Sequence, residues 1–273
     1  MNKNIADYYN KDNLIGKILT WLENSGADMN DLARSELRKY DHFHTEGSKA
    51  TIELADFAQL PKGAHILDIG CGIGGPLRKL VEIYNITGVG IDLTEQFVEA
   101  AEVLTKMIGM ERQLSFLVAD AVSLPFENDS FDALLIQHVG MNIADKQKLH
   151  SEMRRVVKKD GLLMFQEIVR KNAEPLTYPS FWALDESQSL LSDEPTLKED
   201  LARAQFQQLN WKEITDSAIG FYEMMLIAMD KKDRPKPSLG EIMHGDNRLK
   251  TENILVDLKA GKIGAVMGAF KAV

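Results

Sequence analysis

The chain has 273 residues, of which 44% are hydrophobic and 27% charged, and it can therefore bury a core like an ordinary globular protein. The net charge of -9 and the lack of a basic run with interleaved aromatic residues argue against a nucleic-acid partner. No stretch approaches the ~18 consecutive apolar residues of a membrane span, no secretory leader is recognisable, and a single cysteine excludes an internal disulfide. We expect a cytoplasmic protein with a small-molecule substrate, no membrane insertion and no nucleic acid, and these features allow a homodimer.

Residues 1–62 are expected to form a helical lid segment. The stretches 14–23 and 47–60 place apolar residues at helical spacing, and the second ends before the turn signal "PKG" at 61–63.

Residues 63–170 alternate between strand and helix patterns. Strands are expected at 64–70, 87–93, 114–120, 131–139 and 162–169. Helices are expected at 76–84, at 94–109 with Thr94 as the cap, and at 146–161. Continuous apolar strands that alternate with helices predict an α/β fold, a doubly wound and mostly parallel sheet whose ligand lies at the carboxyl ends of the strands.

Residues 171–273 are expected to supply a helical substrate cap and the final strands of the same domain. An aromatic, turn-rich stretch comes first. It is followed by a helix over 195–206, a sixth strand over 211–218, mostly helical segments over 220–232 and 239–261, and a last strand over 262–273.

The loop "ILDIGCGIGGP", residues 66–76, satisfies a pattern that two cofactor classes share. Gly70, Gly72 and Gly75 spell G-x-G-x-x-G, and Asp92 follows 22 residues after Gly70, where a ribose-binding carboxylate is expected. These residues alone leave an NAD(P)-dependent oxidoreductase open. Asp68 favours a different ligand, because a carboxylate two residues before the first glycine repels a pyrophosphate and suits an ammonium group. An equally good interpretation is that Asp68 caps the loop by accepting hydrogen bonds from backbone N–H groups.

The motifs, taken in order, resemble those of class I S-adenosylmethionine (SAM) dependent methyltransferases, in particular small-molecule enzymes of the sarcosine/dimethylglycine and tocopherol type. They are "LDIGCGIGG", "GIDLT", "VADAVSLPF", "FDALLIQHV" and "VVKKDGLLMFQE". The resemblance implies a Rossmann-like, seven-stranded sheet with an antiparallel last strand, N-terminal helices and a helical C-terminal insertion. It also implies SAM as the cofactor and methyl transfer to an N, O or C atom of a small molecule. A SAM-binding protein without turnover is a further alternative.

The resemblance also implies roles at the first two strand ends. Gly70, Gly72 and Gly74 form the loop beneath the methionine part of SAM. Asp92 binds the ribose hydroxyls, and Leu93 packs on the adenine face.

At the next strand ends, Asp120 accepts a hydrogen bond from the adenine amino group and the backbone N–H of Ala121 meets a ring nitrogen. Gln137 and His138 border the methionine end and the substrate. His138 is also the candidate general base, although an equally good interpretation is that it binds backbone and holds the site closed.

The remaining candidates concern the substrate. His44, Phe181 and Trp182 are predicted to line the substrate pocket, whereas Tyr8, Tyr9 and the run 222–225 are typical of core packing. Acidic residues such as Glu167 and Asp185 would favour a cationic amine, whereas the Met- and aromatic-rich C-terminal half would equally favour an apolar ring. No metal is expected, because the other histidines lack a second ligand at metal-binding spacing, and Cys71 is expected to be buried and inert.

Overall fold

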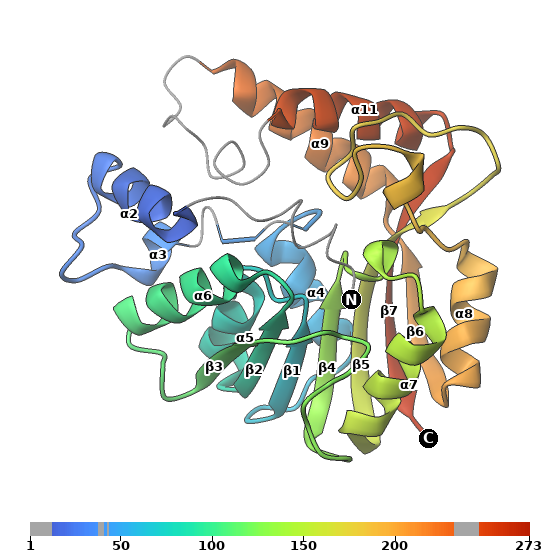
Figure 1. The fold of residues 1–273 in the computed structure, drawn as a ribbon, viewed down its shortest axis with the longest axis horizontal. Coiled ribbons are helices and arrows are strands. Elements are labelled where there is room, and N and C mark those ends of the chain that lie inside the picture. The colour runs from blue at the N-terminus through green and yellow to red at the C-terminus, as the bar shows by residue number, and fades with distance from the viewer. Residues whose placement is uncertain (1–12, 38–40, 43, 232–245) are drawn as a thin grey trace.

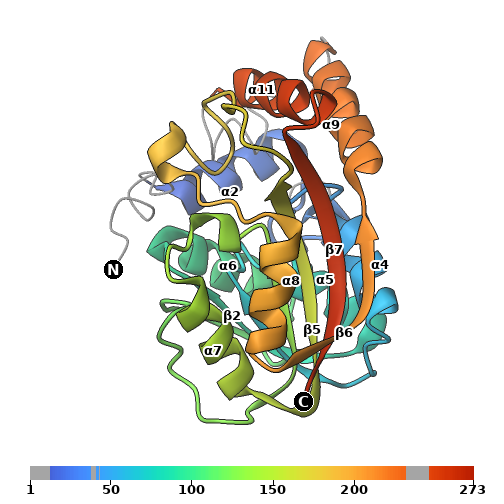
Figure 2. The ribbon, with the colours of Figure 1, turned by 90° about the vertical axis from the view of Figure 1, so that its right-hand side faces the viewer.

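The computed structural model describes residues 13–37, 41–42, 44–231 and 246–273, which form a single seven-stranded sheet with helices on both faces (Figures 1 and 2). The strands are β1 (His65–Ile69), β2 (Thr87–Asp92), β3 (Leu114–Val118), β4 (Phe131–Gln137), β5 (Val157–Arg170), β6 (Phe206–Glu213) and β7 (Ile263–Ala272). The helices are α2 (Leu14–Asn24), α3 (Arg34–Leu37), α4 (Ser48–Phe57), α5 (Gly75–Tyr84), α6 (Glu95–Met107), α7 (Lys146–Val156), α8 (Glu194–Arg203), α9 (Thr215–Asp230) and α11 (Asn247–Lys259), with short 3-10 turns at Gly140–Asn142 and Glu186–Gln188.

The sheet has the order β3-β2-β1-β4-β5-β7-β6. Strands β1 to β5 pair in parallel, and β7 lies antiparallel between β5 and β6. The predicted fold class is therefore confirmed, including the antiparallel last strand. The strand order reverses between β1 and β4, and in sheets of this kind the ligand lies at that point.

Alternate side chains of the strands enter two separate cores. In β1, Ile66 faces the core that α4, α5 and α6 cover, whereas Leu67 and Ile69 face the core that α7 and α8 cover. Figure 2 shows α7 and α8 on one side of the sheet and α4 on the other. Burial on both faces explains why the parallel strands read as continuous apolar runs.

Two groups of helices lie beyond the carboxyl ends of the strands. Leu14, Ile18 and Leu22 of α2 pack with Phe97 and Leu104 of α6 in a third apolar cluster. Helices α9 and α11 lie above the other half of the sheet (Figure 1). Among the described residues, no helix has both the length and the hydrophobicity that crossing a membrane requires.

Predicted boundaries were wrong in two parts of the chain. The helix expected over 146–161 ends at Val156, because Val157 is buried and pairs with Phe131 as the first residue of β5. The sixth strand, expected over 211–218, begins at Phe206, and the residues from Thr215 onward belong to α9. Most of β6 is exposed and polar, so its pairing with β7 defines it and its own apolar pattern does not.

Candidate cofactor and substrate site

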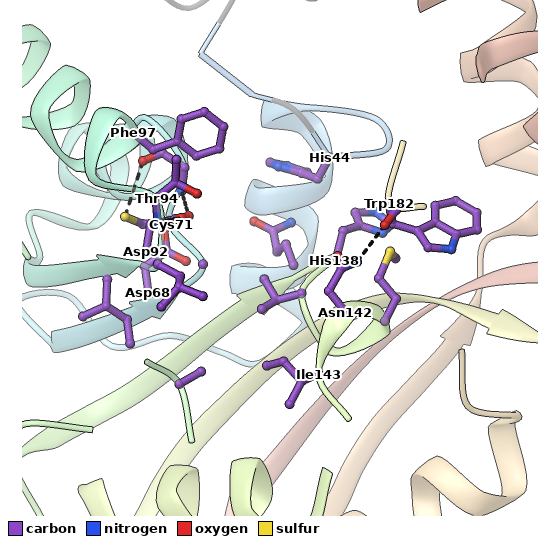
Figure 3. Close-up of a pocket in the computed structure, with 18 of the residues that line it drawn as sticks. His44, Asp68, Cys71, Asp92, Thr94, Phe97, His138, Asn142, Ile143 and Trp182 are labelled. Atoms are coloured by element: carbon purple, nitrogen blue, oxygen red, sulfur yellow. Dashed lines mark hydrogen bonds between the residues drawn. The ribbon is translucent and has the colours of Figure 1, made fainter. Parts of the chain in front are cut away.

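A cavity of about 400 Å³ opens at the carboxyl ends of the parallel strands, within the range of small-molecule sites (Figure 3). It brings together all but one of the site residues that the sequence predicts. Those that line it are His44, Asp68, Gly70, Gly72, Asp92, Leu93, Asp120, Ala121, Gln137, His138, Phe181 and Trp182. Gly74 does not line it.

The loop after β1 can form only with glycine at its turning points. Gly70 and Gly72 have φ angles of 73° and 52°, and a Cβ atom on Gly70 would lie 2.2 Å from Cγ2 of Val139. Gly74 has a φ of 83°, and a Cβ atom there would lie 2.7 Å from the Phe116 ring. Gly74 thus allows the loop to lead into α5. Gly74 packs against Phe116 beside the cavity and is not part of the cavity wall.

Two carboxylates stand at the ends of β2 and β3. Asp92 accepts hydrogen bonds from the backbone N–H of Gly72, at 3.1 Å, and of Thr94, at 2.9 Å. Each bond uses one lone pair of a different oxygen, so both oxygens can still accept from vicinal ribose hydroxyls. Asp120 accepts from the backbone N–H of Val122 at 3.1 Å and also has lone pairs to spare.

Asp68 is buried at the end of β1, with Oδ2 lacking a hydrogen-bond partner in the described structure. Burial, followed by the nearby Asp92, raises the pKa of Asp68 to about 8. An unpartnered buried carboxyl group calls for a cation or a hydrogen-bond donor. The amino-acid ammonium of SAM supplies both, so Asp68, Asp92 and Asp120 fit that cofactor.

His138 follows β4 with a φ angle of 57° and is held through its backbone and its ring. Its N–H donates to Gln166 O at 2.9 Å, and its Nε2 accepts from the N–H of Thr45 at 3.3 Å. Burial, followed by the neighbouring His44, lowers the pKa of His138 to about 3. A general base works best with a pKa near the working pH, so the geometry favours the interpretation of His138 as a residue that holds the site closed.

A buried hydrogen-bond chain joins the segment before α4 to the ends of β4 and β5. Thr51 Oγ1 donates to Gln137 Oε1 at 3.1 Å, and Gln137 Nε2 donates to Gln166 Oε1 at 2.6 Å. Gln166 Nε2 in turn donates to Thr45 O at 3.1 Å. The chain fixes the position of His44, which lies next to Thr45 and borders the cavity.

The opposite end of the cavity is aromatic. The rings of Phe181 and Tyr222 stack with centroids 6.3 Å apart, and Trp182 lies beside them in the wall. Asn142 donates to the backbone carbonyl of Trp182 at 2.7 Å (Figure 3). Tyr222, expected only to pack in the core, both packs there and lines the cavity. Tyr8 and Tyr9 lie outside the described residues.

The segment that carries His44 is fastened by a buried ion cluster. Asp41 Oδ2 accepts from Arg34 at 2.8 Å and from the fully buried Arg78 at 3.2 Å. Arg78 also donates to Thr105 on α6 at 3.0 Å. The cluster joins the N-terminal segment to α5 and α6 at the edge of the cavity, since Asp41 is itself a lining residue.

The proposed cationic preference of Glu167 and Asp185 was wrong, because neither residue lines the cavity. Glu167 is buried and its carboxylate accepts from the backbone of the turn at Gly140 and Met141, and Asp185 caps a 3-10 turn by accepting from Ser187. Conversely, the sequence prediction missed several lining residues. They are Asp41, Thr45, Phe97, Met141, Asn142, Ile143 and Tyr222.

Residues 141–143 follow β4 and were open to prediction from the rule that ligands lie beyond carboxyl strand ends. Asp41, Thr45 and Tyr222 come from segments distant in sequence and carry no such signal. In the described part of the chain, no group of three or more His, Cys, Asp or Glu side chains is arranged to hold a metal ion.

The part of the chain that builds the cofactor half of this cavity resembles a known family. Residues 67–165 match the family described as "Methyltransferase domain". The matched span runs from β1 to the middle of β5 and carries the glycine loop and the carboxylates of the cavity.

Individual relatives are methyltransferases of diverse substrates. The chain is 31% identical over 157 residues to ajmaline N-methyltransferase of Rauvolfia serpentina. The aligned region covers 50% of this chain and 54% of that protein. It is 31% identical over 149 residues to "Probable tocopherol O-methyltransferase, chloroplastic" of Oryza sativa subsp. japonica, covering 55% and 40%. The chain thus spans about half or less of the length of these relatives.

Solved structures share the whole fold. A protein of Galdieria sulphuraria, provisionally named a sarcosine dimethylglycine methyltransferase, has a TM-score of 0.66 at 16% identity, covering 95% of this chain and 98% of that one. The [4+2]-cyclase SpnF has a TM-score of 0.68 at 19% identity, covering 95% and 93%. The resemblance to SAM methyltransferases that the motifs predict is confirmed, and nothing among these relatives favours the oxidoreductase.

Proposed function

We propose that the protein is a SAM-dependent methyltransferase that acts on a small molecule. The observation that carries this proposal is the row of carboxylates Asp68, Asp92 and Asp120 at the ends of three adjacent strands around one cavity. Their spacing along the sheet suits an ammonium, a ribose and an adenine amino group in turn. The methyltransferase family match and the methyltransferase relatives support the same conclusion.

When bound, SAM supplies an electrophilic methyl group on a sulfonium. The chain's contribution is to hold the acceptor in line with that methyl group and to exclude water. Alignment of this kind is worth roughly 7–11 kcal/mol of the barrier. In this proposal, that work falls to Gln137, His138 and the aromatic wall of Phe181, Trp182 and Tyr222, which all line the cavity.

Two alternatives remain distinguishable by experiment. An NAD(P)-dependent oxidoreductase is the first, since its dinucleotide pattern shares the glycine loop and the position of Asp92. The second alternative is a protein that binds SAM without transferring its methyl group. The reason to consider it is that the fold is shared with a protein named as a cyclase.

Thermal unfolding in the presence of SAM or NADH tests the cofactor. We expect SAM, at 100 times its dissociation constant, to stabilise the folded protein by about 2.7 kcal/mol, and NADH to leave the unfolding temperature unchanged. Formation of S-adenosylhomocysteine during incubation with a metabolite panel tests turnover. Protection by NADH alone would reverse the assignment, and SAM binding without turnover on any acceptor would favour the third class.

Within this proposal, residues 1–62 act as a lid segment, 63–170 as the cofactor-binding core, and 171–273 as the substrate cap with the final strands. A cytoplasmic location, a homodimer and the absence of a nucleic-acid partner stay predictions from the sequence.

A further inference from the structure

The structure fixes the tautomer of His44. Its Nε2 lies 2.8 Å from the carbonyl oxygen of Gly47, which can only accept, so Nε2 carries the hydrogen. Burial, followed by the neighbouring His42, lowers the pKa of His44 to about 3, so the ring is neutral near pH 7. A neutral imidazole with its hydrogen on Nε2 has an unshared electron pair on Nδ1.

That electron pair is available to a ligand. Among the described residues, Nδ1 of His44 has no hydrogen-bond partner, and the residue borders the cavity. Figure 3 shows the ring between Phe97 and Asp92 on one side and His138 and Trp182 on the other. Nδ1 is therefore a hydrogen-bond acceptor between the cofactor half and the aromatic half of the site.

The wall next to His44 suits a flat apolar body. The hydroxyl of Tyr222 contacts Oγ1 of Thr45, the residue after His44, at 3.0 Å. This contact brings the stacked pair of Phe181 and Tyr222 to the same end of the cavity. Such surroundings disfavour charge, so an amine bound there is held in its neutral form.

Building on the proposed function, we propose that the methyl acceptor is a neutral amine on a flat apolar ring system, oriented by an N–H···Nδ1 hydrogen bond to His44. This bond aims the nitrogen lone pair away from His44. The lone pair forms the new N–C bond, and the S–C bond breaks with its electron pair going to sulfur. The nitrogen keeps its hydrogen as an ammonium and loses it to water after release.

This step needs no base, which agrees with the weakly basic ring of His44. A hydroxyl acceptor would have to lose its proton during transfer and would need a stronger base than the one present. The orienting role of His44 thus selects an amine over an alcohol or a phenol.

Three bicyclic probes of similar size test the acceptor class, with S-adenosylhomocysteine formation measured by mass spectrometry. They are 1,2,3,4-tetrahydroisoquinoline, a secondary amine; 2-naphthol, a hydroxyl compound; and isochroman, which lacks a donor. We expect methylation of the amine alone. The proposal would be overturned if 2-naphthol were methylated at an equal or higher rate than the amine. It would also be overturned if protein that binds S-adenosylhomocysteine did not methylate the amine. Either result would still be compatible with the proposed cofactor site. Failure to bind S-adenosylhomocysteine would overturn the proposed function itself.

Two substitutions separate orientation from structure at His44. His44→Gln keeps an N–H near Nε2 for Gly47 but removes the acceptor at Nδ1, whereas His44→Asn keeps a polar atom near Nδ1 and loses the bond to Gly47. We expect kcat with tetrahydroisoquinoline to fall about 10–100-fold in His44→Gln and only a few-fold in His44→Asn, because misplacing the acceptor costs up to about 100-fold. Affinity for S-adenosylhomocysteine should stay within about threefold of wild type in both. The reverse order of the two variants would show a purely structural role and contradict the proposal.

Discussion

At the scale of single residues, we predict that Asp68 couples cofactor binding to protonation. Its pKa is raised from 3.8 to about 8, chiefly by burial, so the carboxyl is largely protonated at pH 7. The pKa of an aspartate in the unfolded chain is about 3.9. Between pH 4 and 8, Asp68 is therefore protonated in the folded state to a greater extent than in the unfolded state. Stability of the cofactor-free protein therefore falls as pH rises through this window and is lowest above it.

Asp68→Asn removes the ionisable group and should remove this pH dependence. We expect the unfolding temperature of the variant, relative to wild type, to be several degrees higher at pH 8 than at pH 5. Differential scanning fluorimetry without cofactor measures the difference. If the difference in unfolding temperature between variant and wild type were the same at pH 5 and pH 8, Asp68 would be ionised in the folded state.

The ammonium of SAM favours the ionised form of Asp68, so binding should release up to one proton at pH 7. Titration calorimetry in buffers of different ionisation enthalpy counts that proton. We expect Asp68→Asn to bind without proton release and about 10–100-fold more weakly, as for the loss of a buried charged hydrogen bond. If the variant released as many protons as wild type on binding, a group other than Asp68 would be the source of the released proton.

The local sequence pattern was sufficient to predict which residues at the strand ends line the cavity. Asp68, Asp92 and Asp120 were predictable because each follows or ends an apolar run that reads as a strand. His44 was a candidate, but its tautomer and its neighbours depend on Gly47, Thr51 and Gln137 folding together. No periodicity in the sequence describes such contacts.

At the scale of elements, the segment before α4 is held over the cavity by charge. Asp41→Ala would leave Arg34 and the fully buried Arg78 without their shared carboxylate. Breaking a buried pair costs about 3–5 kcal/mol, which we expect to lower the unfolding temperature by about 10 °C. Asp230→Ala, which removes the exposed partner of Arg248, is the matched control and should change little. Equal effects of the two substitutions would contradict the structural role of the buried cluster.

Close packing between α5 and the same segment gives a second test. A Cβ atom on Gly75 would lie 1.6 Å from the backbone oxygen of Asp41, whereas one on Gly220 in α9 meets nothing within 4 Å. We expect Gly75→Ala to destabilise the protein and weaken S-adenosylhomocysteine binding, because the Asp41 backbone must move. Gly220→Ala should stabilise the protein by about 0.5–1 kcal/mol. Chemical denaturation with calorimetry would measure both, and normal binding by Gly75→Ala would show that this contact does not shape the site.

Helices and strands with one apolar face or a buried apolar run were predicted well, and the exposed ones were not. β6 is the clearest case, since Gln207, Gln208 and Asn210 face solvent and their partners lie in β7, far along the chain. Hydrogen bonds with a distant strand determine where β6 begins. Such pairing leaves no local pattern to read.

At the scale of the whole molecule, the last strand is a central part of the sheet. β7 is almost entirely buried and pairs with β5 on one side and β6 on the other. Deleting residues 262–273 would expose both neighbours and leave β6 without a partner. We expect the shortened chain to lack a cooperative unfolding transition, which circular dichroism during heating would detect. A cooperative transition near that of the full chain would show that β7 is dispensable.

The general architecture followed from the alternation of apolar strands and helices, and the position of β7 followed from the resemblance to a family. The cavity itself was predictable only in its cofactor half, where short segments after consecutive strands converge. Its substrate half combines Thr45, Trp182 and Tyr222 from three distant parts of the chain, so it required the structure.

Calorimetric titration of S-adenosylhomocysteine into the wild-type protein and into Asp92→Ala tests the central claim most directly. The structure predicts binding in the micromolar range by wild type and a loss of about tenfold or more in the variant, because Asp92 accepts the ribose hydroxyls in this account. NADH should give no heat of binding with either protein. No micromolar binding of S-adenosylhomocysteine to wild type, or equal binding to both proteins, would contradict the assignment of this cavity as the SAM site.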